Sequence, residues 1–144
     1  MPFIAAVLLS LLSPLKAQMI AQNYEDASAA MSCWTVINDD KVAVIRDGQS
    51  LAAQARPLNC KSPTGLPDMS QRTILGVQVS GGGCSASYEQ AVYRDDEASK
   101  VVLVVIMHQK GRCRMLIRKD IWVSVPSFPA DYEVTSNITL DQVE

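Results

Sequence analysis

Residues 101–107 read Val-Val-Leu-Val-Val-Ile-Met, and five of these seven apolar residues are β-branched. β-Branched side chains are stiff at χ1 and fit the pleated surface of a sheet better than the surface of a helix. An unbroken apolar run of this length, with no polar residue on either face, is typical of a strand in the middle of a core. The stretch therefore predicts a buried strand around which the rest of the fold is arranged.

Two extended patterns precede this strand. Residues 73–79 include four β-branched residues, residues 84–93 resume an extended pattern, and the sequence Ser-Gly-Gly-Gly lies between them at 80–83. Glycine inside a strand pattern marks a bend or a bulge. We expect two strands joined through a glycine-rich bend, followed by a polar turn at 94–99.

The chain after the apolar run continues in the same manner. Residues 109–111 (Gln-Lys-Gly) form a turn pattern, and residues 112–118 alternate between arginines and apolar residues. Cys113, Met115 and Ile117 then share one face, which is the period-2 pattern of a half-buried strand. Residues 122–126 and 131–135 are expected as closing strands around a proline-marked connection, and the last residues are expected to fray.

The first part of the domain is less regular. Residues 33–37 and 41–46 read as short strands on either side of the turn sequence Asn-Asp-Asp. Residues 48–56 are rich in helix formers and precede Pro57, which disfavours helical backbone in the residue before it. We expect one short helix there, followed by a loop at 59–68.

These elements predict a mainly β fold. We expect one domain over residues 31–140, an antiparallel β-sandwich or partly open barrel with one short helix, stapled by disulfides. A chain of 144 residues is long enough for one hydrophobic core and too short for a second domain of similar size.

Four cysteines, Cys33, Cys60, Cys84 and Cys113, are spread through this domain. Their spacing lacks a C-x-x-C motif, and the chain has a single histidine, so neither a zinc ribbon nor a redox-active pair is expected. Four cysteines allow three pairings. We favour Cys33 with Cys60 and Cys84 with Cys113, because a β-meander places each pair of segments side by side.

Residues 1–21 have the character of an export signal. Their apolar stretch is about a dozen residues long and is interrupted by Pro14, whereas a membrane-spanning helix needs about 20 residues. Cleavage after Ala17, after Ala21 or at residues 27–29 remains open, and a lipoprotein-type site before Cys33 is a weaker alternative. We expect a periplasmic or extracellular protein without an integral membrane segment after cleavage, in a compartment where disulfides form.

The overall charge argues against electrostatic capture by large polyanions. The chain carries 13 basic and 15 acidic side chains, a formal net charge of −2. Such a mild negative charge does not steer a protein to nucleic acid or to anionic lipid. We therefore expect a protein partner and no nucleic acid.

Two groups of residues are candidates for partner contact. Gly81, Gly82 and Gly83 could cradle an anion with backbone N–H groups, although the lysine and hydroxyl of a phosphate loop are missing and a bend or bulge explains them as well. Arg112, Arg114 and Arg118, with lysines nearby, could bind an acidic partner through bidentate guanidinium contacts. The alternative for the arginines is an ordinary solvated strand face.

The remaining polar candidates give little support for catalysis or metal binding. His108 is the only histidine that could act as a general base, and its position at the end of an apolar strand favours a surface or edge role. The acidic pairs at 39–40 and 95–97 lack the alternating spacing of a calcium loop and read as turns. No catalytic residue, metal site or cofactor is expected.

Residues 66–135 carry a recognisable pattern. The segments Leu-Pro-Asp-Met-Ser at 66–70, Thr-Ile-Leu-Gly-Val-Gln at 73–78, Ser-Gly-Gly-Gly-Cys-Ser-Ala-Ser-Tyr at 80–88 and Trp-Val-Ser-Val-Pro at 122–126 resemble small secreted proteins from Bacteroidetes-type bacteria. The same stretch is distantly similar to the C-terminal domain of the PrcB protease-complex stabilising proteins, with Cys84 in place of a tyrosine. The resemblance implies a β-rich exported domain that contacts a protease or another envelope protein, and it supplies no catalytic residue.

The sequence thus predicts an exported, non-enzymatic protein-binding or accessory module. Such a module would present turns, in particular residues 81–83 and 109–111, from a rigid scaffold. Two other functions stay open: an inhibitor of a secreted hydrolase, for which a disulfide-bonded loop reduces the ordering entropy lost on binding, and a structural envelope protein whose exposed strand edges pair between chains.

Overall fold

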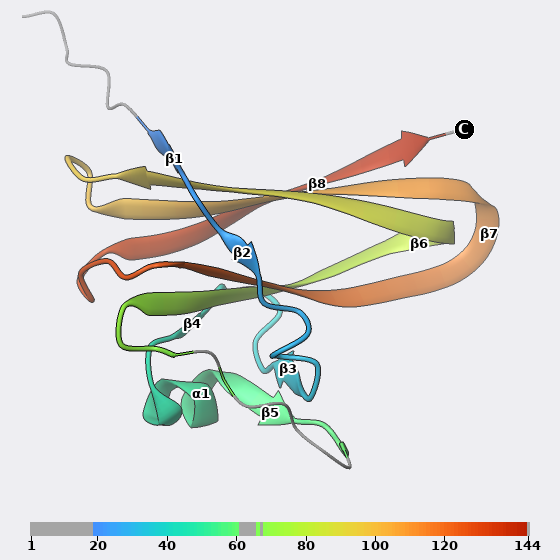
Figure 1. Cartoon of the computed structure of the whole chain (residues 1–144). Helices are drawn as coiled ribbons and strands as arrows, with labels where there is room; N and C mark the ends of the chain where they lie inside the picture. The colour runs from blue at the N-terminus through green and yellow to red at the C-terminus, as the bar shows by residue number, and fades with distance from the viewer. Residues whose placement is uncertain (1–18, 61–65, 67, 144) are drawn as a thin grey trace, which may run out of the picture.

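The computed structural model describes residues 19–60, 66 and 68–143. The described part is mainly β, with one short helix, as predicted (Figure 1). The elements in chain order are β1 (Ile20–Gln22), β2 (Glu25–Asp26), β3 (Trp34–Val36), β4 (Ala43–Ile45), α1 (Gly48–Gln54), β5 (Ala55–Pro57), β6 (Arg72–Asp95), β7 (Lys100–Pro126) and β8 (Glu133–Val143).

One long hairpin organises the molecule. β6 and β7 pair antiparallel from Arg72 opposite Pro126 to Asp95 opposite Lys100. This two-stranded ribbon folds over on itself, and Figure 1 shows the two halves as layers joined by the curve of β7 on the right. We call residues 72–82 with 116–126 the first layer, and residues 85–95 with 100–110 the second layer.

Short strands flank each layer. In the first layer β4 pairs with β6 and β2 pairs with β7; in the second layer β1 pairs with β6 and β8 pairs with β7. β1 and β2 are consecutive in the chain and connect the two layers on one side. β4 and β8 lie at the other side of the two layers and are not paired with each other, so that side stays open. The fold is therefore sandwich-like and only partly closed, in agreement with the prediction.

The main core lies between the two layers. Every second residue of the 101–107 run points into it, and the run contributes four buried side chains, Val101, Leu103, Val105 and Met107. The strand is confirmed, but the expectation that both its faces are buried is wrong. Val102, Val104 and Ile106 are half-buried, because no element of the described residues covers the outer face of the second layer.

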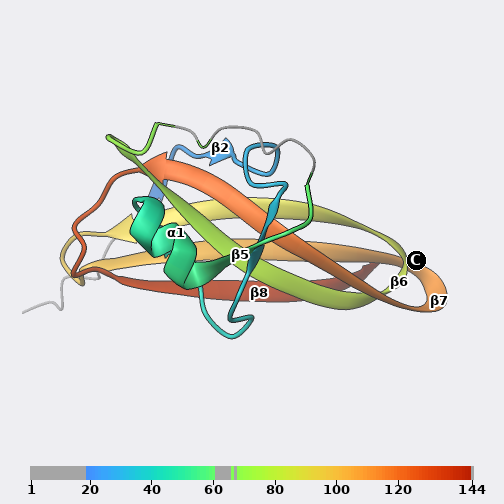
Figure 2. The same cartoon turned by 90° about the horizontal axis from the view of Figure 1, so that it is seen from below.

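A smaller second core covers the outer face of the first layer. α1 and the β3–β5 pair lie against it (Figure 2) and bury Ile45, Ile74 and Trp122 together with Met31 and Leu51. The ring of Trp122 lies over Gly76, which is its register partner across the hairpin. The first layer is thus buried on both faces.

Three predicted boundaries differ from the structure. The helix ends at Gln54 instead of residue 56, because residues 55–57 pair with β3. Residues 73–79 and 84–93 belong to one strand with a bulge between them, since hydrogen bonding to β7 resumes past the glycines. The final strand does not end at residue 135 and fray; it continues to Val143. Together with β1 and β2, it extends the sheet beyond residues 31–140.

The direction of β8 follows from the folded ribbon. The two halves of β7 run in opposite directions, because β7 turns back on itself at the bend. The chain leaves the first layer at Pro126, crosses to the second layer and enters β8 beside the start of β7, with Glu133 opposite Lys100. β8 therefore pairs parallel with β7 in a sheet that is otherwise antiparallel.

Candidate functional site

Two disulfides stabilise different parts of the fold, one at the β3–β5 pair and one at the bend of the β6–β7 hairpin. Cys33 is bonded to Cys60, joining the residues just before β3 and just after β5, with a Cα–Cα distance of 5.7 Å. Cys84 is bonded to Cys113 across the bend of the hairpin, with a Cα–Cα distance of 4.8 Å. The favoured pairing is confirmed, because each disulfide joins neighbouring segments of sheet.

The bend is an irregular bulge. Gly83 faces both Arg114 and Met115, whereas Ser85 faces Lys110, so Cys84 lies opposite three residues of β7. Gly83 and Gly111 have φ values of 122° and 83°, a region that side chains other than glycine rarely adopt. A side chain at Gly111 would also overlap Sγ of Cys84. The bend or bulge prediction for the glycines is confirmed.

The anion-cradle alternative for these glycines lacks a free donor at its centre. The N–H of Gly82 donates to Oε1 of Gln109 at 2.7 Å. A side chain at Gly81 would meet the ends of Met107 and Gln109. Gly81 thus leaves room for the side chains of Met107 and Gln109, whereas a Cβ at Gly82 would meet only ordinary van der Waals contacts.

We call residues 110–119 of β7 the tip. Met115 and Leu116 are 58% and 67% exposed there, and Cys113 is also exposed. The strand expected for this segment is confirmed, but the half-buried face is wrong for Cys113 and Met115; of the three residues expected on it, only Ile117 packs against the main core. The alternation of apolar and charged residues is present, but the bend carries Cys113 and Met115 past the end of the core (Figure 1).

The tip concentrates positive charge. Its ten residues include no acidic side chain and five basic ones, namely Lys110, Arg112, Arg114, Arg118 and Lys119. The rest of the chain then has 8 basic and 15 acidic side chains. Lys119 lies 4.8 Å from the ring centre of Tyr88. Across the residues described, no carboxylate forms an ion pair with the other four.

A hollow lies beside the tip. It has a volume of about 620 Å³ and is lined by Gly82, Gly83, Gln109, Gly111, Arg112, Cys113, Gln142 and Val143. The hollow joins the glycine bulge to one of the arginines. The structure thus brings Gly82, Gly83 and Arg112 together, whereas the hollow does not include Arg114 and Arg118, which lie further along the tip.

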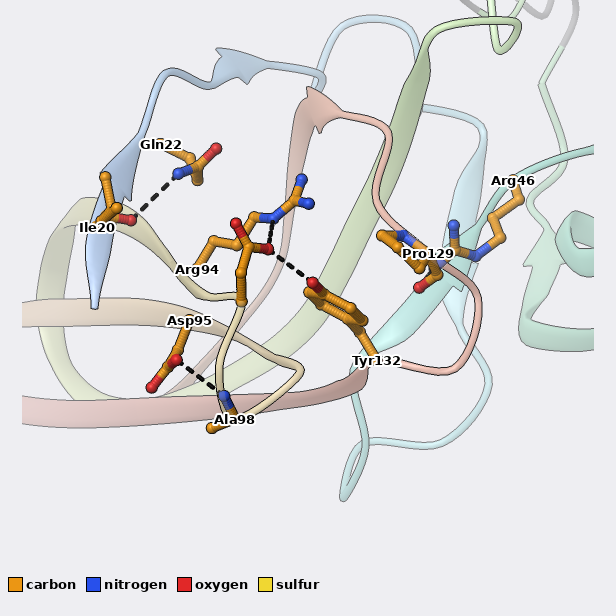
Figure 3. Close-up of polar contacts among 9 residues, drawn as sticks. Ile20, Gln22, Arg46, Arg94, Asp95, Ala98, Pro129 and Tyr132 are labelled. Atoms are coloured by element: carbon orange, nitrogen blue, oxygen red, sulfur yellow. Dashed lines mark hydrogen bonds and ion pairs between the residues drawn. The ribbon is translucent and has the colours of Figure 1, made fainter. Parts of the chain in front are cut away.

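At the turn between β6 and β7, charged side chains are paired with one another. Arg94 donates to Asp96 at 2.6 Å, and the hydroxyl of Tyr132 donates to the same carboxylate oxygen at 2.6 Å (Figure 3). Both hydrogen bonds lower the pKa of Asp96, and that of Tyr132 has the larger effect. The buried Asp95 accepts the N–H of Ala98 and closes the predicted turn. Arg94 thus has a carboxylate partner, whereas the described residues give no such ion pair to Lys110, Arg112, Arg114 or Arg118 of the tip.

His108 lies between two carboxylates on the outer face of the second layer. Its Nδ1 is 2.8 Å from Asp141 of β8, and its Nε2 is 2.7 Å from Glu89 of β6. Both ring nitrogens thus face carboxylates, and neither bonds to a hydroxyl or a thiol. The surface position expected for His108 agrees with this arrangement, which connects three adjacent strands.

The sequence did not reveal the partners of His108. Glu89 and Asp141 are 19 and 33 residues away in the chain, and Asp141 lies in the segment expected to fray. Only the parallel pairing of β8 brings Asp141 opposite His108. No local pattern signals such a contact.

We expect the stability of the folded chain to decrease as the pH rises above 6.5 through the titration of His108, whose pKa is raised in the folded state. The hydrogen bond with Glu89 has the largest effect and the one with Asp141 the next largest, and together they raise the pKa of His108 above its ordinary value of 6.5. The stabilisation is thus complete below pH 6.5 and is lost as the pH rises through the higher folded-state pKa. Urea unfolding at a series of pH values measures it. His108→Gln should flatten the profile in this window, and an unchanged profile would contradict the assignment.

The acidic clusters 39–40 and 95–97 have turn contacts in the structure. Asn38 accepts the N–H of Asp40 through its side chain, and Asp95 acts similarly for Ala98. Among the described residues, no group of three or more histidine, cysteine or acidic side chains is placed to hold a metal ion. Within the same residues, the helix is neither long nor apolar enough to cross a membrane.

Comparison of the chain with protein-family models, with curated proteins and with solved structures finds no match.

Proposed function

We propose that the chain is an exported, non-enzymatic protein-binding or accessory module that contacts an acidic surface of an envelope protein through the tip. The observation that carries the proposal is the composition of the tip: five basic side chains, no acidic one, and exposed Met115 and Leu116 in the same ten residues. A solvated strand face explains charge alone. It does not explain two large apolar side chains exposed among the charges.

The architecture of the tip suits recognition. Arginine is enriched at interfaces because its planar guanidinium binds carboxylates through two parallel hydrogen bonds. Methionine is also enriched at the buried centres of interfaces, so Met115 beside the arginines suits a contact with a partner. The Cys84–Cys113 disulfide fixes the base of the tip, so less conformational entropy is lost when a partner binds.

The resemblance to PrcB-type domains suggests the class of partner. It implies contact with a protease complex or another protein of the envelope, which the module would stabilise. Export is part of the proposal, with a signal segment at residues 1–21 that lies mostly outside the described residues. Cleavage after Ala17 would leave β1 whole, whereas cleavage after Ala21 would remove two of its three residues.

We expect charge reversal at the tip to weaken partner binding. The immobilised, oxidised protein is used to isolate partners from the envelope fraction of the source organism, and the dissociation constant of each is measured by calorimetry. The variant R112E/R114E/R118E should weaken binding at least tenfold and remove its salt dependence. The matched control K41E/R56E reverses two exposed charges away from the tip and should bind normally.

Equal binding by the tip variant and the wild type would contradict the proposal. The identity and response of the partner separate the versions of the function. A protease that becomes more stable supports the accessory role, and a hydrolase that loses activity supports the inhibitor alternative.

A further inference from the structure

The outer edge of β8 is free. β8 has eleven residues and pairs with β7 along its whole length, and no other described strand lies on its second edge. A long edge strand exposes a row of backbone donors and acceptors that can pair with another strand. Natural edges are commonly protected by proline, lysine, bulges or short length. β8 contains no proline and no lysine and is eleven residues long, and its two charged side chains, Glu133 and Asp141, lie toward its two ends.

The other edges of the sheet are protected. The side-chain amide of Gln54 accepts the N–H of Val44 at 2.8 Å and donates to its carbonyl at 2.9 Å, which occupies the free edge of β4. β1 and β2 have only three and two residues. Among the strands of this sheet, β8 is thus the long edge that remains available.

β8 also exposes apolar side chains. Ile138 and Leu140 are 38% and 50% exposed, although their register partners Val105 and Met107 are fully buried. Register partners point to the same face of a sheet, so Ile138 and Leu140 continue the apolar face of the main core onto a strand that the first layer does not cover. This apolar pair adjoins the free edge.

We propose that β8 pairs antiparallel with β8 of a second copy of this chain, around a two-fold axis at Thr139. In this register Ile138 lies opposite Leu140 of the second copy, and Thr139 lies opposite its own copy. Apolar pairs and threonine pairs both stabilise antiparallel neighbours. Asn137 lies opposite Asp141 of the second copy, where an amide donor meets a carboxylate acceptor.

The charges of β8 favour this register over the one centred on Asn137. A two-fold axis at Asn137 instead would place Glu133 opposite Asp141 of the second copy, and like charges directly opposite each other are destabilising. The axis at Thr139 removes this clash, because Glu133 then lies beyond the end of the paired segment. It also pairs the two apolar residues with each other. The second layers of both copies become one continuous sheet.

Sedimentation equilibrium of the oxidised protein over a concentration series tests the association. The expected result is a reversible monomer–dimer equilibrium. The variant I138K/L140K should shift it to monomer, because lysine lies opposite lysine in the proposed register. L116K is the matched control at the tip, an exposed apolar residue replaced in the same way, and it should still dimerise. A wild type that stays monomeric, or a dimer that tolerates I138K/L140K, would overturn the proposal.

Cross-linking tests the register itself. Thr139 and Thr135 lie on the same face of β8 and both are exposed. Thr139→Cys places two thiols opposite each other at the two-fold axis and should form an interchain disulfide under mild oxidation. Thr135→Cys, which faces Val143 of the second copy, should not. Equal cross-linking at both positions would overturn the proposed register. Sedimentation and cross-linking use the purified protein without a partner, so their outcome is independent of the proposed partner contact, although L116K itself lies in the tip.

Discussion

Replacing Gly76 with alanine is expected to lower the free energy of unfolding by about 3 kcal/mol, toward the upper end of the cost of overpacking a core. A Cβ at this position would overlap Cζ3 and Cε3 of Trp122. Trp122 is 2% exposed and packed among Ile74, Ile45 and Leu51, so its ring has no free space into which it can move. Urea unfolding followed by circular dichroism measures the change.

Gly48→Ala is the matched control. A Cβ at Gly48 meets no atom within 4 Å, and the residue lies in the first turn of α1, so this substitution should be neutral or slightly stabilising. Trp122→Ala alone should cost about 3 to 5 kcal/mol. In the double variant with Gly76→Ala, the cost of the alanine at 76 should largely disappear, because residues in contact are not additive. Additive costs would contradict the packing described for this pair.

Removing the Cys84–Cys113 disulfide with C84A/C113A is expected to cost about 3 to 4 kcal/mol by the chain-entropy relation. The bond closes a loop between residues 29 apart. The disulfide also ties the tip to β6. Without it the backbone of the tip should unfold locally more often, so trypsin should cleave faster after Arg112, Arg114 and Arg118 under native conditions. Denaturant unfolding and limited proteolysis with mass spectrometry measure the two effects.

C33A/C60A is the matched control for this disulfide. That bond closes a loop of nearly the same size, between residues 27 apart, so the same relation gives a similar loss of stability. It lies away from the bend, and trypsin cleavage at the tip should stay at the wild-type rate in conditions where both variants remain folded. Equal cleavage in both variants would show that global unfolding, and not the tip, controls the cut.

The sequence was sufficient to predict the features that depend on neighbouring residues. β-Branched content predicted the strand at 101–107, and Pro57 limited the helix to within two residues of its end. The favoured disulfide pairing followed from a meander, because each bond joins segments that are adjacent in the sheet. The glycine run predicted the bulge through the freedom of its backbone.

The features that sequence could not predict depend on the fold of the long hairpin. The alternation of Cys113, Met115 and Ile117 is a valid strand signal, yet only the position of the bend decides whether one face is covered. The same folding makes β8 parallel to β7 and brings Asp141 to His108 from a distant part of the chain. A pattern of period 2 indicates that two faces differ; it does not indicate what lies against either face.

The hydrogen bonds between the Gln54 amide and the backbone of Val44 limit how many copies of the chain can join edge to edge. A chain with two usable sheet edges can add copies at both and grow into a fibre, which is the hazard of β-rich proteins. Gln54 saturates the edge of β4, and β1 and β2 are only three and two residues long, so each copy offers one long edge among the described strands of this sheet. In the proposed dimer both copies use that edge, and no long edge of the described sheet would be left for a third copy.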